Sequence, residues 1–132
     1  MALDELPIIL VVEDEAVIQD FVEDTLTEAG FHPMASPTGE EALTLLQSGV
    51  VRYRALVTDI NLNGGMSGWE MARRVREIDP SFPVIYMTGA AADQWASQGV
   101  PNSILLEKPF APAQLVTAVS QLLNTGNPSP SM

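Results

Sequence analysis

The sequence has no cysteine among its 132 residues, which excludes disulfide bonds, thiol nucleophiles and zinc–cysteine sites. Basic residues are also few: six lysines and arginines stand against 17 aspartates and glutamates, and the formal net charge is −11. A chain this acidic lacks the positive surface by which proteins bind phosphate backbones. We therefore expect no DNA or RNA partner.

Long apolar runs are missing as well. No segment approaches the roughly 18 consecutive apolar residues that a membrane-spanning helix needs. Residues 1–7 carry two acids and no base, unlike a targeting peptide. The sequence thus predicts a soluble, cytoplasmic protein with no membrane partner. A chain of 132 residues is expected to form one domain, and it is long enough to bury a core without a metal or disulfide.

Strand-like and helix-like segments alternate along the chain. Continuous β-branched and apolar runs are typical of strands buried on both faces of a parallel sheet, and apolar residues three or four positions apart indicate covering helices. The predicted strands are 8–12, 32–35, 55–58, 83–87 and 104–106; the predicted helices are 18–29, 38–49, 69–78, 90–98 and 115–122. This alternation predicts a doubly wound α/β fold with a five-stranded parallel sheet, a flavodoxin-like (βα)5 three-layer sandwich.

The folded domain is expected to cover residues 1–123. Residues 124–132 contain glycine, two prolines and serines but almost nothing apolar. We expect this C-terminal tail to be disordered, and it is too short to be an output domain.

Polar side chains follow four of the predicted strands. Glu13 and Asp14 follow the first strand, Asp59 the third, Thr88 the fourth, and Lys108, the only lysine, the fifth. In open α/β sheets, ligands bind at the carboxyl ends of the strands. Each residue alone has an ordinary explanation, such as a helix cap, a hydroxyl bonded to backbone or a surface lysine. Their shared placement at strand ends predicts a functional site.

The chemistry of these side chains favours a metal and a phosphoryl group. Like charges about 4 Å apart repel by on the order of 4 kcal/mol at an effective dielectric constant of 20, so three neighbouring carboxylates call for a cation. Mg²⁺ fits better than Ca²⁺, because the sequence has no looped array of oxygen ligands. An aspartate beside a metal can act as a nucleophile that takes up phosphate. The metal, Lys108 and Thr88 would then satisfy the three phosphoryl oxygens.

With these residues in view, the sequence resembles the receiver domains of bacterial two-component response regulators, of the stand-alone, single-domain type. The resemblance runs from about residue 7 to residue 123. It rests on five motifs: Leu10-Val11-Val12-Glu13-Asp14-Glu15, Thr58-Asp59-Ile60-Asn61-Leu62, Met66-Ser67-Gly68-Trp69-Glu70, Met87-Thr88-Gly89 and Glu107-Lys108-Pro109-Phe110.

The resemblance implies a role for each site residue. Asp59 corresponds to the phosphoacceptor and a metal ligand, Asp14 to the direct metal ligand and Glu13 to its water-mediated neighbour, while Asn61 would lend its backbone carbonyl to the metal. Thr88 corresponds to the hydroxyl residue that follows the phosphoryl group, and Lys108 to the lysine that binds it. The implied cofactor is Mg²⁺, with Mn²⁺ as an alternative ion. The bond before Pro109 is a candidate cis peptide.

The function implied is a phosphorylatable switch in a two-component phosphorelay. A histidine kinase or histidine phosphotransfer protein would donate the phosphoryl group, and output would pass to an unidentified downstream protein by contact or by phosphate relay. We expect a monomer or weak dimer that is not an enzyme beyond accepting and losing its own phosphoryl group. One alternative is an aspartate-nucleophile phosphatase, but such enzymes need a second acid where this chain has Asn61. Another is a receiver-like scaffold that works unphosphorylated, against which the complete residue set argues.

Two features depart from the family pattern. Leu105 stands three positions before the lysine, where the family usually has an aromatic residue that turns inward on phosphorylation. Tyr86, Trp95 or Leu105 itself is therefore a candidate for signal transmission. The loop Asn61–Gly68 is one residue longer than usual and lacks its proline, so loop mobility and phosphoryl lifetime are expected to differ.

Other conspicuous side chains have structural interpretations. We expect His32 to be a surface residue at the start of a strand. The remaining expectations are packing roles for Trp69, Trp95 and Phe110, and a solvated helix face for Arg73, Arg74 and Arg76.

Overall fold

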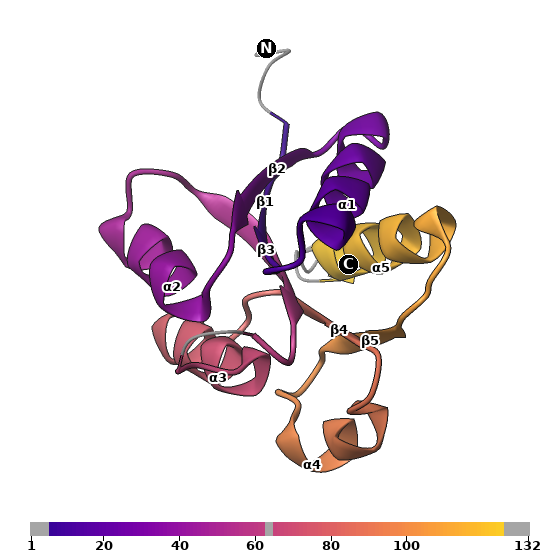
Figure 1. Cartoon of the computed structure of the whole chain (residues 1–132). Helices are drawn as coiled ribbons and strands as arrows, with labels where there is room; N and C mark the ends of the chain where they lie inside the picture. The colour runs from indigo at the N-terminus through magenta and orange to yellow at the C-terminus, as the bar shows by residue number, and fades with distance from the viewer. Residues whose placement is uncertain (1–5, 63–64, 126–132) are drawn as a thin grey trace.

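Five parallel strands form one sheet in the order β2–β1–β3–β4–β5 (Figure 1). The computed structural model describes residues 6–62 and 65–125. The strands are β1 (Ile8–Val12), β2 (His32–Ser36), β3 (Tyr53–Asp59), β4 (Val84–Thr88) and β5 (Ile104–Glu107). The helices are α1 (Ala16–Glu28), α2 (Gly39–Ser48), α3 (Gly68–Ile78), α4 (Trp95–Gln98) and α5 (Pro112–Thr125), with a 3₁₀ turn η1 (Ala92–Gln94) before α4. The predicted doubly wound α/β fold is confirmed.

Helices cover both faces of the sheet, so the molecule has three layers (Figure 1). Alternate residues of β1 point to opposite faces: Ile9 and Val11 pack with α1 and α5, whereas Leu10 and Val12 pack with α2 and α3. Each of these four side chains is completely buried. A strand covered on both faces must be apolar at every position, which explains the continuous apolar run in the sequence.

Helix ends follow the local sequence signals. The side chains of Thr38 and Ser67 accept hydrogen bonds from the backbone N–H groups of Glu41 and Glu70, and so cap α2 and α3. Gly49 follows α2 with a φ of 70°, a left-handed conformation that favours glycine. Local residue types therefore account for both ends of α2 and for the start of α3.

The structure corrects two predicted boundaries. A helix was expected over 90–98, but only the η1 turn and the four-residue α4 are present there. The N–H groups of Ala90 and Ala91 bond to the Thr88 hydroxyl instead, and no residue of η1 or α4 is buried, so little packing supports a longer helix. At the other end, α5 continues to Thr125, two residues beyond the expected domain end at 123. The rest of the predicted tail, 126–132, lies outside the described residues.

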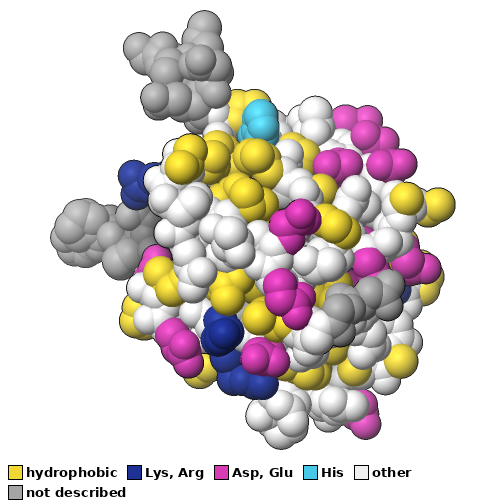
Figure 2. Space-filling model, turned by 60° about the vertical axis from the view of Figure 1, so that its left-hand side comes forward, with side chains coloured by type: hydrophobic (Ala, Val, Ile, Leu, Met, Phe, Trp, Pro, Cys, Tyr) yellow, Lys and Arg dark blue, Asp and Glu magenta, His cyan; other side chains and the backbone are white. Residues whose placement is uncertain are grey.

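The face of the molecule drawn in Figure 2 carries more acidic than basic side chains. Figure 2 shows acidic side chains scattered among apolar and uncharged ones on one face, with basic side chains confined to small areas. His32 is exposed at the start of β2, as expected. Among residues 6–62 and 65–125, no helix has the length and apolar character needed to span a bilayer.

Candidate functional site

The site lies where the strand order reverses. The chain passes from β1 to β2 on one side and then to β3 on the other, so β1 and β3 are neighbours in the sheet. Val12 pairs with Thr58 at the carboxyl ends of these strands, which places Glu13 and Asp59 side by side. This is the crevice in which open α/β sheets bind their ligands.

Three carboxylates and one ammonium group meet in this crevice. Glu13, Asp14 and Asp59 each offer one oxygen atom, and the three atoms lie within 4.8 Å of one another. The Nζ atom of Lys108 lies 3.1 Å from Oε1 of Glu13 and 3.3 Å from Oδ1 of Asp59. The structure thus brings together four of the predicted site residues from β1, β3 and β5.

Glu13 is held from several sides although it follows the strand rather than belonging to it. Its N–H donates to the carbonyl of Ser36, and its own carbonyl accepts a hydrogen bond from the Gln19 side chain. Its Oε2 atom accepts from the N–H of Glu15, which leaves Oε1 for Lys108. Because its side chain is completely buried, Glu13 cannot be an ordinary solvated acid. Gln19 is a supporting residue that the sequence patterns did not indicate.

Asp59 is fixed by its own backbone and by one glycine. The N–H of Ile60 donates to Oδ1 of Asp59 at 2.9 Å, so Oδ1 has both this donor and Lys108 nearby. The N–H of Gly68 donates to the carbonyl of Ile60 at 2.8 Å. A Cβ atom on Gly68 would lie 2.2 Å from the carbonyl oxygen of Asp59. Only glycine lets α3 start this close to the end of β3.

Burial and charge shift the ionisation of these groups. Burial raises the pKa of Glu13 and of Asp59 above their ordinary values, and repulsion from neighbouring carboxylates adds to the increase. For Lys108, burial acts to lower the pKa, but the attraction of Asp59 and Glu13 outweighs it and the pKa is raised. Lys108 is therefore a permanent cation between two carboxylates that are costly to keep ionised.

The donor set fits a hard divalent cation. Three carboxylates converge within the described part of the chain, and oxygen is the ligand that Mg²⁺ prefers. Asn61 lies two residues after Asp59, in the loop that leaves β3, and its carbonyl stays a predicted ligand. Residues 63–64 of this loop lie outside the described residues, so the expected effect of its extra length stays a prediction.

Thr88 belongs to the site but its hydroxyl faces the next loop. Its Oγ1 accepts hydrogen bonds from the N–H groups of Ala90 and Ala91, at 3.1 and 2.8 Å. A hollow beside this loop is lined by both Thr88 and Lys108, and the Thr88 carbonyl accepts a hydrogen bond from the Lys108 N–H. The Lys108–Pro109 peptide bond is cis. The Thr88 hydroxyl is thus positioned by backbone rather than by Asp59.

The three candidates for signal transmission occupy different environments. Tyr86 is completely buried, contacts the ring of Trp69 in a tilted arrangement with 4.7 Å between ring centroids, and accepts a hydrogen bond from the Val100 N–H. Leu105 pairs with Tyr86 in the sheet and packs against the same core, whereas Trp95 is partly exposed and bonds to the Ser103 hydroxyl. Tyr86 is the one that links β4 directly to the segment after α4, and all three roles stay predictions.

The expected packing and surface roles are partly confirmed. Trp69 and Phe110 are buried, as expected, and Phe110 packs on Phe21, whereas Trp95 is exposed, so a packing role is not confirmed for it. The expectation of a solvated face is wrong for Arg76: its guanidinium donates to the carbonyls of Phe82 and Pro101, at 2.6 and 2.7 Å. Burial lowers the pKa of Arg76. Arg73 donates more weakly to Gln98. Sequence periodicity placed these side chains on the outer helix face but could not show the neighbouring loops that reach it.

The comparisons with known proteins agree with this geometry. Residues 9–120 match the family model described as "Response regulator receiver domain". The chain is 33% identical over 117 residues to the response regulator receiver protein CpdR of Brucella abortus, covering 87% of this chain and 95% of that protein. It is 30% identical over 120 residues to the transcriptional regulatory protein CusR of Escherichia coli, of which it spans 52%.

A solved structure is similar along nearly the whole chain. The crystal structure of a response regulator receiver protein from Sinorhizobium medicae superposes with a TM-score of 0.90 at 50% sequence identity, covering 93% of this chain and 98% of the other. In this chain, the same fold forms the crevice at the ends of β1 and β3 in which Glu13, Asp14, Asp59 and Lys108 meet. The chain therefore belongs to the family of response regulator receiver domains.

Proposed function

We propose that this domain is a phosphorylatable switch of a two-component phosphorelay, with Asp59 as the acceptor. The observation that carries the proposal is the position of the Asp59 carboxylate, which lies 3.3 Å from Lys108 and within reach of two further carboxylates. A phosphohistidine on a histidine kinase or phosphotransfer protein is the proposed donor. A cytoplasmic location belongs to the same proposal.

The proposed transfer is a single in-line displacement. Oδ1 of Asp59 is held by Ile60 and Lys108, whereas Oδ2 has no hydrogen bond or ion pair among the described residues. Oδ2 attacks phosphorus, the new O–P bond forms, and the P–N bond to the donor imidazole breaks. The leaving imidazole keeps the electron pair of the broken bond and becomes neutral histidine after taking a proton from solvent. Lys108 offers its ammonium to one phosphoryl oxygen.

Glu13, Asp14 and Asp59, with the Asn61 carbonyl, would hold Mg²⁺ or Mn²⁺. A bound divalent ion supplies positive charge that stabilises the anionic phosphoryl oxygens and the clustered carboxylates. Asp14 is the less buried member of the three, so it is the carboxylate most open to solvent. Glu13 already accepts hydrogen bonds on both oxygens, which favours a role through an intervening water.

The test is phosphorylation by a small-molecule acyl phosphate such as acetyl phosphate. We expect the native protein to gain the mass of one phosphoryl group when Mg²⁺ is present and none when it is removed. Asp59→Asn keeps the size of the side chain but removes the nucleophile, so it should gain nothing. Asp24→Asn, on the exposed face of α1, is the matched control and should behave as the native protein. The measurement is intact-protein mass spectrometry.

Three other outcomes would contradict or change this proposal. Modification of Asp59→Asn at the native level would refute Asp59 as the acceptor. If the native protein is not modified but Mg²⁺ raises its melting temperature, then the site binds metal and accepts only from a protein donor. If neither effect occurs, the alternative of a scaffold that works unphosphorylated is favoured.

We also propose that the domain does not turn over a separate phosphorylated substrate. A phosphatase with an aspartate nucleophile needs an acid to protonate the leaving group, and the position two residues after Asp59 is Asn61. Steady release of phosphate from a phosphomonoester such as p-nitrophenyl phosphate, lost in Asp59→Asn, would contradict this part of the proposal.

An apolar groove beside the site is suited to the protein donor. It is lined by Val17, Ile18 and Phe21 of α1 and by Lys108, Pro109 and Phe110. Val17 is 81% exposed and Phe21 36% exposed, so the groove presents neighbouring apolar side chains to solvent rather than a single one. Since Lys108 lines the groove and also contacts Asp59, a protein docked here would place its phosphohistidine next to the acceptor.

Val17→Glu should therefore slow phosphotransfer from a histidine kinase at least about tenfold, because it buries a charge in an apolar contact. Phosphorylation by acetyl phosphate should be unchanged, since that donor needs no docking. Val50→Glu is the control: Val50 is 85% exposed but follows α2, on the other face of the sheet. Equal rates for the two variants with the kinase would show that the donor docks elsewhere.

A further inference from the structure

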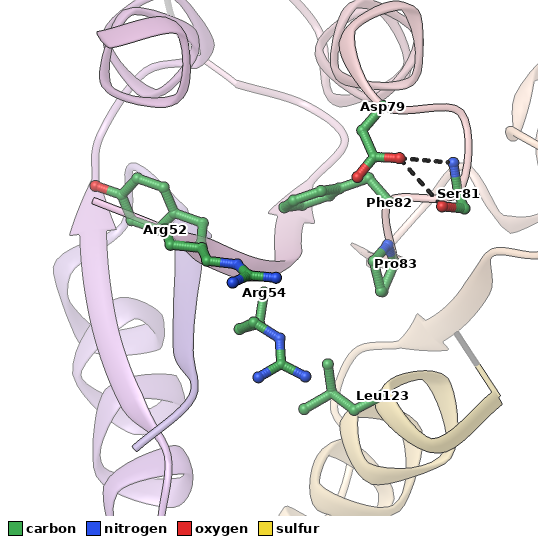
Figure 3. Close-up of a pocket in the computed structure, with 8 residues that line it drawn as sticks. Arg52, Arg54, Asp79, Ser81, Phe82, Pro83 and Leu123 are labelled. Carbon is green, nitrogen blue, oxygen red and sulfur yellow. Dashed lines mark hydrogen bonds between the residues drawn. The ribbon is translucent and has the colours of Figure 1, made fainter. Parts of the chain in front are cut away.

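A second pocket, shown in Figure 3, lies beside the start of β3, whereas Asp59 lies at the other end of that strand. The pocket has a volume of about 430 Å³ and is bounded by the start of β3, the loop before β4 and the end of α5. Two arginines, Arg52 and Arg54, line it together with Asp79, Ser81, Pro83 and Leu123. The proposed phosphorelay function uses none of these residues.

Arg52 and Arg54 stand two residues apart at the start of β3, a spacing that puts side chains on the same side of an extended chain, and a β-bulge falls at Arg54. Ile8 of β1 pairs with Tyr53, but the next residue, Ile9, pairs with Ala55, so Arg54 is an extra residue in β3. A bulge redirects the side chain of the extra residue and is common beside functional sites. Figure 3 shows the side chains of Arg52 and Arg54 extending into one region of the pocket, between β3 and Leu123.

These two guanidinium groups have no hydrogen bond or ion pair within residues 6–62 and 65–125. Lys108, Arg73 and Arg76 have charged groups that contact oxygen atoms of the protein, whereas Arg74, exposed on α3, has no such partner among the described residues either. What distinguishes Arg52 and Arg54 is that both line the same pocket, in a chain with 17 acidic residues and only six basic ones. Two neighbouring positive charges repel each other, and an anion between them would remove that repulsion.

The other side of the pocket is polar but opposite in charge. Oδ1 of Asp79 accepts hydrogen bonds from the N–H and the hydroxyl of Ser81, both at 3.1 Å (Figure 3). This carboxylate opposes the binding of a bare anion. It can accept a hydrogen bond from a hydroxyl group, because its second oxygen has no hydrogen bond among the described residues. The pocket therefore suits a molecule with an anionic end and a hydroxyl-bearing end.

We propose that this pocket binds the phosphate group of a small organic phosphate through Arg52 and Arg54. A single guanidinium group can bind a carboxylate through two parallel hydrogen bonds. Two guanidinium groups, with two positive charges, match a phosphate dianion with three terminal oxygens. Hydroxyl groups next to the phosphate would reach Asp79. The site is separate from Asp59, so its existence does not depend on phosphorylation of the domain.

The test is a titration followed by NMR of the backbone amides, without divalent metal, using inorganic phosphate and ribose 5-phosphate as separate probes. We expect saturable shifts at Arg54, Ser81 and Phe82, with tighter binding of ribose 5-phosphate. Arg52→Gln and Arg54→Gln should each weaken binding about tenfold, the effect of losing one charged hydrogen-bonding group. Arg74→Gln, an exposed arginine of α3, is the control and should leave binding unchanged.

Asp79→Asn identifies the source of the phosphate. If it removes the advantage of ribose 5-phosphate over inorganic phosphate, the ligand is an organic phosphate with neighbouring hydroxyls. Equal affinity of the native protein for the two probes would overturn that assignment. The proposal also fails if neither probe shifts Arg54, Ser81 and Phe82, if shifts appear only at Thr88–Ala90, or if Arg74→Gln weakens binding as much as Arg52→Gln.

Discussion

Gly68→Ala is expected to lower the free energy of unfolding by about 3 kcal/mol, at the upper end for overpacked sites. The added Cβ atom would lie 2.2 Å from the carbonyl oxygen of Asp59 and 2.8 Å from Cα of Ile60. Both are backbone atoms, so no side-chain rotation relieves the contact. Either α3 or the end of β3 must move. For a domain of this size the melting temperature should fall by roughly 10 °C.

Gly68→Ala should also slow phosphorylation, because the backbone that must move includes that of Asp59. The hydrogen bond from the Gly68 N–H to the Ile60 carbonyl holds the end of β3 against α3. Phosphorylation by acetyl phosphate, measured well below the melting temperature, should be at least about tenfold slower, since positioning errors on the order of 1 Å can cost 100-fold. Urea denaturation and the phosphorylation assay measure the two effects separately.

Gly89→Ala provides the control for Gly68→Ala. A Cβ atom added at Gly89 would have no other atom within 4 Å, and this residue does not need a left-handed backbone. Its substitution should change the free energy of unfolding by less than about 0.5 kcal/mol. If Gly68→Ala is as stable as Gly89→Ala, then α3 does not depend on the close approach described above.

Lys108→Gln should destabilise the metal-free protein by about 2 kcal/mol at pH 8. It removes the cation that contacts Glu13 and Asp59 and leaves two buried carboxylates facing each other. Breaking a fully buried ion pair costs more, but Lys108 keeps 18% of its side chain exposed, so solvent screening reduces the effect. Phosphorylation by acetyl phosphate should fall at least about 100-fold, because no other ammonium side chain can take the phosphoryl oxygen.

The loss of stability in Lys108→Gln should shrink as the pH falls. Burial already raises the pKa of Asp59 and Glu13, and without Lys108 both are raised further. Between the ordinary carboxyl pKa of about 4 and these raised values, the folded protein binds more protons than the unfolded chain. The free energy of unfolding therefore rises as pH decreases through this window. Urea denaturation at pH 8 and pH 6 measures the difference.

The double variant Lys108→Gln, Asp59→Asn is the control for this interpretation. Removing one of the two facing carboxylates should restore most of the stability lost in Lys108→Gln, and should weaken the dependence on pH. Asp59→Asn alone should be at least as stable as the native protein without metal, because the buried charge of Asp59 is costly. If the double variant instead loses as much free energy of unfolding as the two single variants predict by simple addition, then Lys108 stabilises the fold by packing rather than by charge.

Local patterns in the chain were enough to predict the strands, most helix ends and the carboxylates and lysine that meet in the crevice. Strands buried on both faces need continuous apolar residues, so the apolar runs of β1 and β4 are enough to predict these strands from the sequence. Parallel strands also bring their carboxyl ends to one edge, which made Glu13, Asp14, Asp59 and Lys108 predictable as neighbours. Local periodicity therefore predicts the strands, and the topology of a parallel sheet predicts which site residues are neighbours.

Features that depend on close approach between distant segments arise only in the folded molecule. The contact of Gly68 with Asp59, the binding of Arg76 to the Phe82 and Pro101 carbonyls, and the shortness of α4 arise from loops whose paths no local pattern encodes. The one-residue bulge between β1 and β3 at Arg54, and the approach of Asp79 and Leu123 that completes the pocket beside Arg52 and Arg54, also arise only in the folded chain. A shift of one residue changes where a strand side chain points, and that register is set by packing across the sheet rather than by the residues themselves.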